Sequence, residues 1–467
     1  MNPTSFRFSL AALRAAATGF ALAAMIWAAS PPSSAQEKKA RPVTFEIKPA
    51  PLTEDREERA LPGPVGGACV GGGGRFIVLT IPAERKIAVF DVNEAKIVKN
   101  IAIEDDAPSV AASLDKLVVA GGGKIDRYSL DTFEKEGSVK LPAGQTGAVL
   151  LMGSATRGPL VGLVDGVPGF LDPNTLKPAK GYAIDIGKRE KLTEGVARIS
   201  ADGRVVTTYN PHSSPQGHHA YVRTGTLYKK LTPDNHDVSG HFFPGPEGRF
   251  FYSAVGVLNA AGKPVGKKGA YGDGSKYSLP AAEGEGFFLR IDVPGFPHGD
   301  KKKMGKVYLH ATGDDRPLGE LTGVQPPSGL NHWGREKFGV DKHFFLVPSA
   351  QLLVVLPESL DKLILHRIDL DKLLATAEYD YLVVASRPPR DAVANTVYTY
   401  EPVVKSKKGG VKLKLESGPK GMKIEDGRLT WTVPAPLAGR EVDVSVGVSD
   451  AAGREVFHTF KLDVRAK

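Results

Sequence analysis

Histidines are the residues of this 467-residue chain whose type and spacing first suggest chemistry. Imidazole is the commonest metal ligand in proteins, and a zinc site needs three or four ligands that converge on one point. The tightest pair is His236 and His241, with Asp237 next to the first of them. The candidate metal ligands are therefore His212, His236 and His241. Five of the eleven histidines crowd into one stretch, namely His212, His218, His219, His236 and His241.

The surroundings of these histidines favour a simpler interpretation. Gly, Pro and Ser dominate the stretch, and no HExxH or comparable ligand spacing occurs. Solvated loop histidines are the expectation. The chain also has no GxSxG elbow, no Walker loop and no GxGxxG after a strand candidate. The sequence thus predicts no catalytic residue and no cofactor, and it gives no support for calcium or a transition metal.

Cysteine content and charge exclude further classes. Cys69 is the single cysteine, so an intramolecular disulfide, a zinc finger and a CxxC redox motif are excluded. The net charge of +9 is mild for this length, and no nucleic-acid partner is expected. The 53 Gly and 35 Pro residues indicate many turns and few long helices. A hydrophobic content of 41% is enough for a packed core.

Residues 1–35 have the features of a secretory signal peptide. Arg7 and Arg14 precede an apolar run at 15–29, and Ser33-Ser34-Ala35 supplies small residues for cleavage after Ala35. An uncleaved anchor is the alternative, but the run is shorter than the ~20 residues that a span needs. We expect an extracytoplasmic protein, periplasmic, secreted or on the cell surface, with no membrane span after cleavage. Residues 36–64 are predicted to be an extended leader.

A repeat accounts for the middle of the chain. Three segments share a Gly-Arg-apolar-apolar start at Gly74, Gly203 and Gly248, and strand candidates at 116–120, 158–164 and 352–356 fill the other phases. A period of about 40–45 residues built from short strands and turns is typical of a propeller blade, which is a four-stranded antiparallel sheet. We predict an all-β fold with a β-propeller over residues 65–378. Seven blades is the best count, with six and eight as alternatives.

Two smaller elements accompany the propeller. Residues 44–48 are expected to supply a strand that closes the ring with the last blade. A short helix is expected after Asp369, because apolar residues recur at the helical positions 370, 373, 374 and 377.

The blade sequences carry a family resemblance. The segments 89–92 (Val-Phe-Asp-Val) and 127–130 (Arg-Tyr-Ser-Leu) resemble the WD40-like and YVTN-like propellers of bacterial secreted proteins. The resemblance covers residues 65–375, without the Gly-His and Trp-Asp dipeptides of true WD40 blades. The chain is similar to large uncharacterised bacterial families that pair such a propeller with an Ig-like domain.

Residues 398–467 change to strict alternation, after a linker at 379–397. Apolar side chains alternate with polar ones at 411–415, 429–433, 442–448 and 460–464, and Gly and Pro turns separate these runs. This pattern predicts an Ig-like β-sandwich, with Trp431 as a core residue. Four segments resemble dystroglycan-type cadherin-like and putative Ig domains of bacterial surface proteins: Tyr398–Tyr400, Ser417–Met422, Asp426–Trp431 and Ser449–Gly453. The Asp-rich motifs of calcium-binding cadherin linkers are absent, so the resemblance implies no calcium site.

Two functional hypotheses follow from these observations. The first is an exported, monomeric, non-enzymatic scaffold that binds a protein or polysaccharide at the propeller rim and through the Ig-like domain. The second is a propeller enzyme, such as a lactonase or a quinoprotein-like dehydrogenase, with its site in the central channel. An enzyme requires carboxylates, histidines or a metal converging at one channel mouth. Because propellers host both classes and no motif for chemistry occurs, the sequence favours the scaffold.

Overall fold

The computed structural model describes residues 45–105, 108–141, 149–164, 167–185, 196–212, 217–231, 240–266, 276–293, 305–328, 330 and 338–467. Within them the chain from residue 45 onward belongs to one compact unit. The predicted signal peptide lies outside the described residues. Among the described residues, no helix combines the length and the apolar character that a bilayer crossing requires.

Seven sheets follow one another along residues 56–367 of the described chain, and we number them as blades 1 to 7. Blade 1 contains β2 (Gly67–Gly71), β3 (Phe76–Ile81), β4 (Lys86–Asp91) and β5 (Lys96–Ala102). Blade 2 contains β6 (Ser109–Ala112), β7 (Lys116–Gly121), β8 (Lys124–Ser129) and β9 (Lys135–Lys140). Blade 3 contains β10 (Val149–Leu151), β11 (Leu160–Val164) and β12 (Val167–Leu171).

The remaining blades repeat this meander. Blade 4 contains β14 (Val196–Ile199), β15 (Val205–Tyr209), β16 (His219–Thr224) and β17 (Leu227–Leu231), with β13 (Ala183–Ile184) parallel to β17 at its edge. Blade 5 contains β18 (Phe242–Pro244), β19 (Phe250–Ser253) and β20 (Gly256–Asn259). Blade 6 contains β21 (Lys276–Pro280), β22 (Phe287–Asp292), β23 (Lys306–Ala311) and β24 (Pro317–Glu320). Blade 7 contains β25 (Phe344–Val347), β26 (Leu352–Val355) and β27 (Lys362–Arg367).

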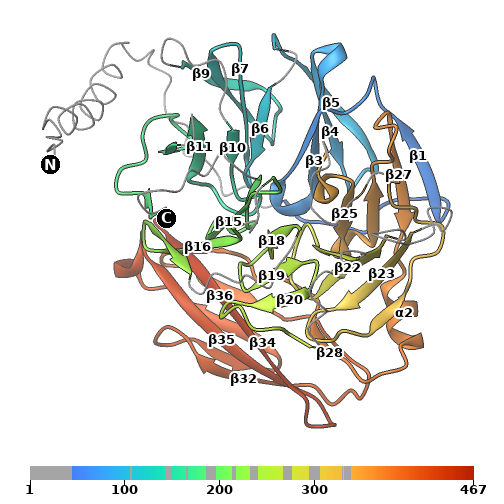
Figure 1. Ribbon diagram of the computed structural model, residues 1–467. Coiled ribbons are helices and arrows are strands. Elements are labelled where there is room, and N and C mark those ends of the chain that lie inside the picture. The colour runs from blue at the N-terminus through green and yellow to red at the C-terminus, as the bar shows by residue number, and fades with distance from the viewer. Residues whose placement is uncertain are drawn as a thin grey trace, which may run out of the picture. The chain divides into compact units, whose positions relative to one another are not determined.

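A strand from the start of the chain completes blade 7. β1 (Arg56–Ala60) pairs antiparallel with β27, in a register that runs from Arg56 opposite His366 to Ala60 opposite Lys362 (Figure 1). Side chains of blades 1 and 7 also share one buried core, which contains Phe90 and Leu363. The ring is therefore closed, and the fold is the predicted all-β propeller. The predicted closing strand at 44–48 is wrong, because the described residues 45–48 form no strand.

Burial explains why the inner strands were readable as apolar runs. Every residue of β3 is buried, because this strand lies within blade 1 and has neighbouring blades against both faces. The outer strand β9 instead alternates between exposed and partly buried positions. Blades stacked in a ring thus need apolar residues on both faces of their inner strands and on one face of their outer strands.

Two sheets with a common core follow the propeller, and we call them the C-terminal sandwich. One sheet contains β29 (Asp391–Val393), β32 (Lys412–Ser417), β35 (Glu441–Ser449) and β36 (Glu455–Arg465). The other contains β30 (Val397–Tyr400), β33 (Lys423–Glu425) and β34 (Arg428–Thr432). Trp431 is 1% exposed at the centre of their shared core, as predicted.

A helix and a small sheet join the two parts. α2 (Leu370–Thr376) begins after Asp369, whose side chain caps the helix by accepting from the backbone N–H of Lys372. The helix therefore forms where the apolar spacing predicted it. β28 (Leu382–Val384) follows and pairs with β31 (Val404–Ser406). Lys405 of β31 also forms an exposed salt bridge of 2.8 Å with Asp371 of the helix.

Candidate functional site

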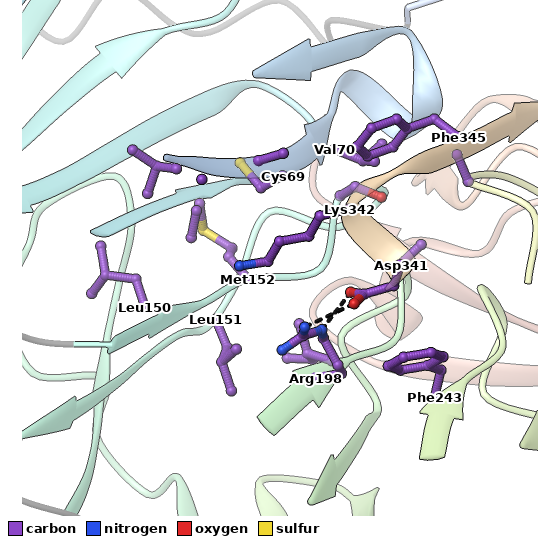
Figure 2. Close-up of a pocket in the computed structure, with 18 of the residues that line it drawn as sticks. Cys69, Val70, Leu150, Leu151, Met152, Arg198, Phe243, Asp341, Lys342 and Phe345 are labelled. Carbon is purple, nitrogen blue, oxygen red and sulfur yellow. Dashed lines mark hydrogen bonds and ion pairs between the residues drawn. The ribbon is translucent and has the colours of Figure 1, made fainter. Parts of the chain in front are cut away.

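The first strands of all seven blades line one cavity. β2, β6, β10, β14, β18, β21 and β25 each contribute to its wall, so the cavity is the central channel of the propeller. Its volume is about 460 Å³, which lies within the range of small-molecule pockets. The lining side chains are mostly apolar, and Figure 2 shows Leu150, Met152, Phe243 and Phe345 among them.

An ion pair between Arg198 and Asp341 bridges this channel. Arg198 belongs to β14 of blade 4, and Asp341 belongs to the 3-10 turn η3 (Val340–Lys342) that leads into β25 of blade 7. Nε of Arg198 donates to Oδ2 of Asp341 at 2.5 Å, and Nη2 donates to Oδ1 at 2.9 Å. Gly339 makes room for the pair, because a Cβ at this position would lie 2.7 Å from Oδ1 of Asp341.

The bidentate geometry keeps both partners charged. Burial alone would raise the pKa of the Asp341 carboxyl, but the Arg198 guanidinium holds that pKa below its usual value. Burial alone would lower the pKa of Arg198, and the Asp341 carboxylate raises it instead. Both carboxylate oxygens are engaged, so Asp341 acts as a tie across the channel rather than as a free base.

Lys342 and Cys69 face the same cavity from blades 7 and 1. Burial lowers the pKa of Lys342, and the nearby Arg198 guanidinium lowers it further. No carboxylate of the described residues forms a salt bridge with its ammonium group, which lies 5.8 Å from the centre of the Phe338 ring. Burial raises the pKa of the Cys69 thiol to about 12, although Lys342 opposes that rise. Cys69 is therefore a protonated thiol at neutral pH and not an activated nucleophile.

The linker covers the other end of the channel. A second cavity of about 430 Å³ lies between residues 387–391 and the turns that follow the first strands of the blades. Arg387 lies 3.7 Å from Glu283 across this cavity, and Arg390 lies 3.6 Å from Asp202. Gly73 has a φ of 66°, and a Cβ there would lie 2.8 Å from the Arg387 guanidinium. The glycine run of blade 1 therefore gives the linker room at the channel mouth.

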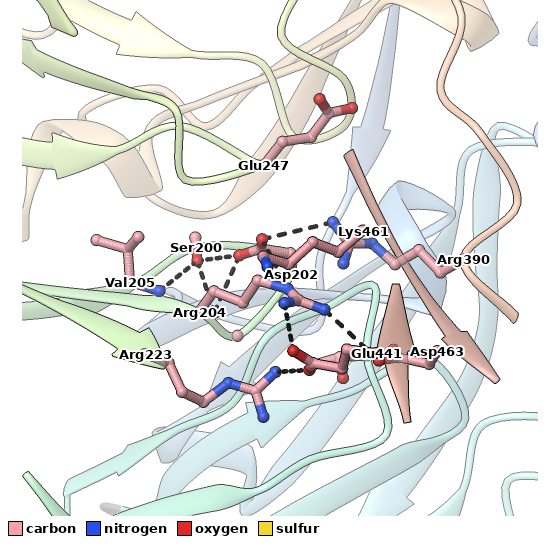
Figure 3. A network of polar contacts seen from close by, with 12 residues as sticks. Ser200, Asp202, Arg204, Val205, Arg223, Glu247, Arg390, Glu441, Lys461 and Asp463 are labelled. Atoms are coloured by element: carbon pink, nitrogen blue, oxygen red, sulfur yellow. Dashed lines mark hydrogen bonds and ion pairs between the residues drawn. The ribbon is translucent and has the colours of Figure 1, made fainter. Parts of the chain in front are cut away.

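A cluster of charged residues fixes the sandwich to this end of the propeller (Figure 3). Arg204 Nη1 lies 2.9 Å from Oε2 of Glu441, and Arg223 Nη2 lies 2.8 Å from Oε1 of the same carboxylate. Arg204 also lies 3.5 Å from Asp463 and 3.6 Å from Asp202. Glu441 and Asp463 come from β35 and β36, so two neighbouring strands of the sandwich reach blade 4.

The repeat arginines serve this docking. Arg204 and Arg249 follow the repeated glycines of blades 4 and 5, and Nη1 of Arg249 donates to the backbone oxygen of Phe457 at 3.1 Å. Arg75, the equivalent residue of blade 1, instead pairs with Asp91 inside its own blade at 2.7 Å. Arg157 of blade 3 forms a salt bridge with Asp391 of the sandwich.

The structure describes two of the three predicted metal ligands. His212 is exposed in the turn after β15, whereas His241 is fully buried and its Nε2 lies 3.1 Å from the backbone oxygen of Ser278. His236 lies outside the described residues, so the three-histidine candidate stays a prediction. The expectation of solvated loop histidines is wrong for His218 and His241, because both are buried among aromatic rings. Within the described ranges, no group of three His, Cys, Asp or Glu could hold a metal ion.

Sequence reasoning missed the channel residues. Arg198 interrupts the short β14 segment Val-Ala-Arg-Ile, and Asp341-Lys342 precedes the apolar Phe-Phe-Leu-Val of β25. One signal was available in the sequence. A charged residue stands inside or beside the first strand of these blades, where neighbouring blades have small or apolar residues. Nothing in the sequence pairs Arg198 with a partner 143 residues away.

Comparisons with known proteins yield structural likeness alone. No family model matches the chain, and no curated protein matches it. The structure is similar to the β-propeller domain of Cps50 (Swd1) from Myceliophteria thermophila, with 11% identity, 67% of this chain and 100% of that chain covered, and a TM-score of 0.37. It is similar to hydrazine synthase of Kuenenia stuttgartiensis, with 11% identity, 70% and 100% covered, and a TM-score of 0.42. These scores carry no argument about function, and the resemblances to YVTN-like and cadherin-like families stay predictions.

Proposed function

We propose that this chain is an exported, non-enzymatic scaffold that binds a protein or polysaccharide partner at the propeller rim and on its C-terminal sandwich. The observation that carries the proposal is the Glu441 contact with both Arg204 and Arg223. These charge-assisted bonds hold the propeller and the sandwich in one arrangement. A rigid pair of domains presents a composite surface without an ordering cost on binding, which suits a binding scaffold.

The channel chemistry supports the same proposal. A channel enzyme needs a base, a nucleophile or an electrophile that is free to act. Both oxygens of the Asp341 carboxylate are bound to Arg198, and the Cys69 thiol is protonated. No histidine is among the described lining residues of the cavity. The described part of the channel therefore offers one unpaired cation, Lys342, but no base and nucleophile side by side.

The first experiment tests export. The full chain is produced in a bacterial host, and the N-terminus of the extracytoplasmic product is sequenced. Cleavage after Ala35 would give a product that begins at Gln36. A product that stays in the cytoplasm with Met1 or residue 2 at its N-terminus would contradict the export part of the proposal.

The second experiment tests the scaffold. The exported chain is immobilised and titrated with purified envelope polysaccharides. Envelope proteins that cross-link to the chain are identified, purified without the cross-linker and titrated in the same way. The matched variant is Glu441→Gln with Asp463→Asn, which removes the sandwich carboxylates from Arg204. We expect a partner that binds the wild-type chain at least about tenfold more tightly than this variant, since docking preorganises the surface. Turnover of lactones or quinone-dependent oxidation of alcohols, abolished by Asp341→Asn, would contradict the proposal.

A further inference from the structure

The central channel combines an apolar wall with one cation that forms no salt bridge with any described residue. Leu150, Met152 and Phe345 represent the wall, and Lys342 is the cation. Figure 2 shows the Lys342 side chain reaching into the pocket, apart from the joined Arg198–Asp341 pair. Because that pair is neutral as a unit, Lys342 gives the described cavity a net charge of +1.

The side chain of Lys342 is partly buried, so its ammonium group loses part of its hydration in the channel. Transferring an ammonium group from water to an apolar site is unfavourable without an ionic or hydrogen-bonding partner. Lys342 has been placed in a wall that otherwise consists of small and apolar residues, and its ion-pair capacity is unused by the described residues. The neighbouring Asp341 cannot take this role in addition, because both of its oxygens already accept from Arg198.

We propose that the channel binds a small amphiphile with an apolar body and a single anionic group, whose charge pairs with Lys342. The single charge follows from the cavity, since a dianion would leave one buried charge without a partner. The apolar body follows from the wall, whose side chains are mostly apolar. The cavity of about 460 Å³ is large enough for a ligand of this kind. Val149, which lines the cavity, is 50% exposed, so solvent reaches this part of the wall.

Calorimetric titration of the full exported chain tests this site. The probes are decanoate, decanol and decyltrimethylammonium, which share one chain length and differ in charge. We expect decanoate to bind with a stoichiometry of one per chain, at least about tenfold more tightly than decanol, as one charge-assisted hydrogen bond would give. Decyltrimethylammonium should bind more weakly than decanol, because its cation would face Lys342.

Three variants locate the site. Lys342→Met keeps an apolar side chain of similar length and should remove the preference for decanoate while decanol binding persists. Lys342→Arg keeps the charge and should keep the preference. Cys69→Phe fills the cavity and should abolish binding of both probes. The exposed Lys372 on α2 provides the matched control, and Lys372→Met should bind decanoate like the wild-type chain.

Three results would overturn the inference: no binding of decanoate to the wild-type chain, equal affinity for decanoate and decanol, or unchanged decanoate affinity in Lys342→Met. Circular dichroism of each variant shows whether it is folded, and Lys342→Arg keeps the charge test valid if Lys342→Met does not fold. The site is separate from the proposed rim partner, so either proposal can fail without the other.

Discussion

Arg198 and Asp341 are 143 residues apart in the chain, yet their side chains form a bidentate ion pair that joins blade 4 to blade 7 across the channel. In a ring of seven blades these two are on opposite sides. Contacts between neighbouring blades act around the ring, whereas this pair acts through its centre. The pair therefore opposes a movement of blades 4 and 7 away from each other, which contacts between neighbouring blades do not oppose directly.

Asp341→Asn should destabilise the fold by about 3–5 kcal/mol, because it leaves the Arg198 charge without a partner in the channel. Urea unfolding measures the change. The double variant Arg198→Met with Asp341→Leu should recover most of the loss, since no charge then remains unpaired. As a control, Asp443→Asn removes an exposed partner of Lys461 and should cost less than about 1 kcal/mol. Equal losses of unfolding free energy in Asp341→Asn and Asp443→Asn would argue against a stabilising role of the Arg198–Asp341 pair.

Glu441→Gln should loosen the sandwich from the propeller. The change removes the charge that Arg204 and Arg223 share, at a cost of about 1–3 kcal/mol in the docked state. Limited proteolysis should then cut residues 385–390, between β28 and β29, several-fold faster than in the wild-type chain. Glu425→Gln is the control, because Glu425 pairs with Lys423 on an exposed hairpin of the sandwich. Unchanged linker cleavage in Glu441→Gln would show that docking does not depend on this carboxylate.

The buried histidines predict a loss of stability on acidification. Burial lowers the pKa of His241 and His458 to about 3 and that of His218, His310 and His366 to about 4. In the unfolded chain these histidines bind protons near pH 6.5, whereas in the folded chain they stay neutral until about pH 4. The stability of the folded state is therefore fully present above pH 6.5 and decreases as the pH falls toward 4. Each histidine contributes a slope of about 1.4 kcal/mol per pH unit in that window.

His458→Phe tests this pH dependence, because the pKa of His458 falls to about 3 through burial and Phe cannot be protonated. The free energy of unfolding, measured between pH 7 and pH 4.5, should fall less steeply in this variant by about one proton. The exposed His212 supplies the control, and His212→Gln should leave the slope unchanged. An identical slope in His458→Phe and the wild-type chain would contradict the assignment.

Cys69 should react slowly with thiol reagents. Its pKa of about 12 makes the thiolate on the order of a thousandfold rarer at pH 7.4 than in a free cysteine. Labelling with methyl methanethiosulfonate should accelerate about tenfold per pH unit up to pH 10. Lys342→Met should slow it further, because the ammonium favours the thiolate. A Cys69→Ser chain that carries Ser417→Cys on the exposed β32 gives the reference rate. Labelling of Cys69 at that reference rate would contradict a raised pKa of this thiol.

The propeller was predictable because inner strands are buried on both faces. Such strands read as continuous apolar runs, and the repeated Gly-Arg start marks the turn before the second strand of blades 1, 4 and 5. Blade 6 has no such mark, and its strands β22 and β23 occupy Phe287–Asp292 and Lys306–Ala311. The gap from 249 to 352 is longer than two periods, so a fixed period does not locate this blade.

The closing strand was not predictable in the same way. Arg56–Ala60 has the sequence Arg-Glu-Glu-Arg-Ala and alternates between exposed and partly buried positions, because it is the outer edge of blade 7. An edge strand needs no apolar run, and its charges protect it from pairing with other chains. The channel pair escaped prediction for another reason, since Arg198 and Asp341 meet through the ring and not through sequence proximity.

Closure of the ring by β1 has a consequence for the order of folding. The register places Glu58 opposite Ile364, and Glu58 also forms a salt bridge with Lys362, 304 residues later in the chain. During synthesis from the N-terminus, β1 therefore has no partner strand until blade 7 has been made. Contacts of such long sequence separation slow folding, because a long loop closes before they form. Ring closure therefore cannot precede the formation of blade 7.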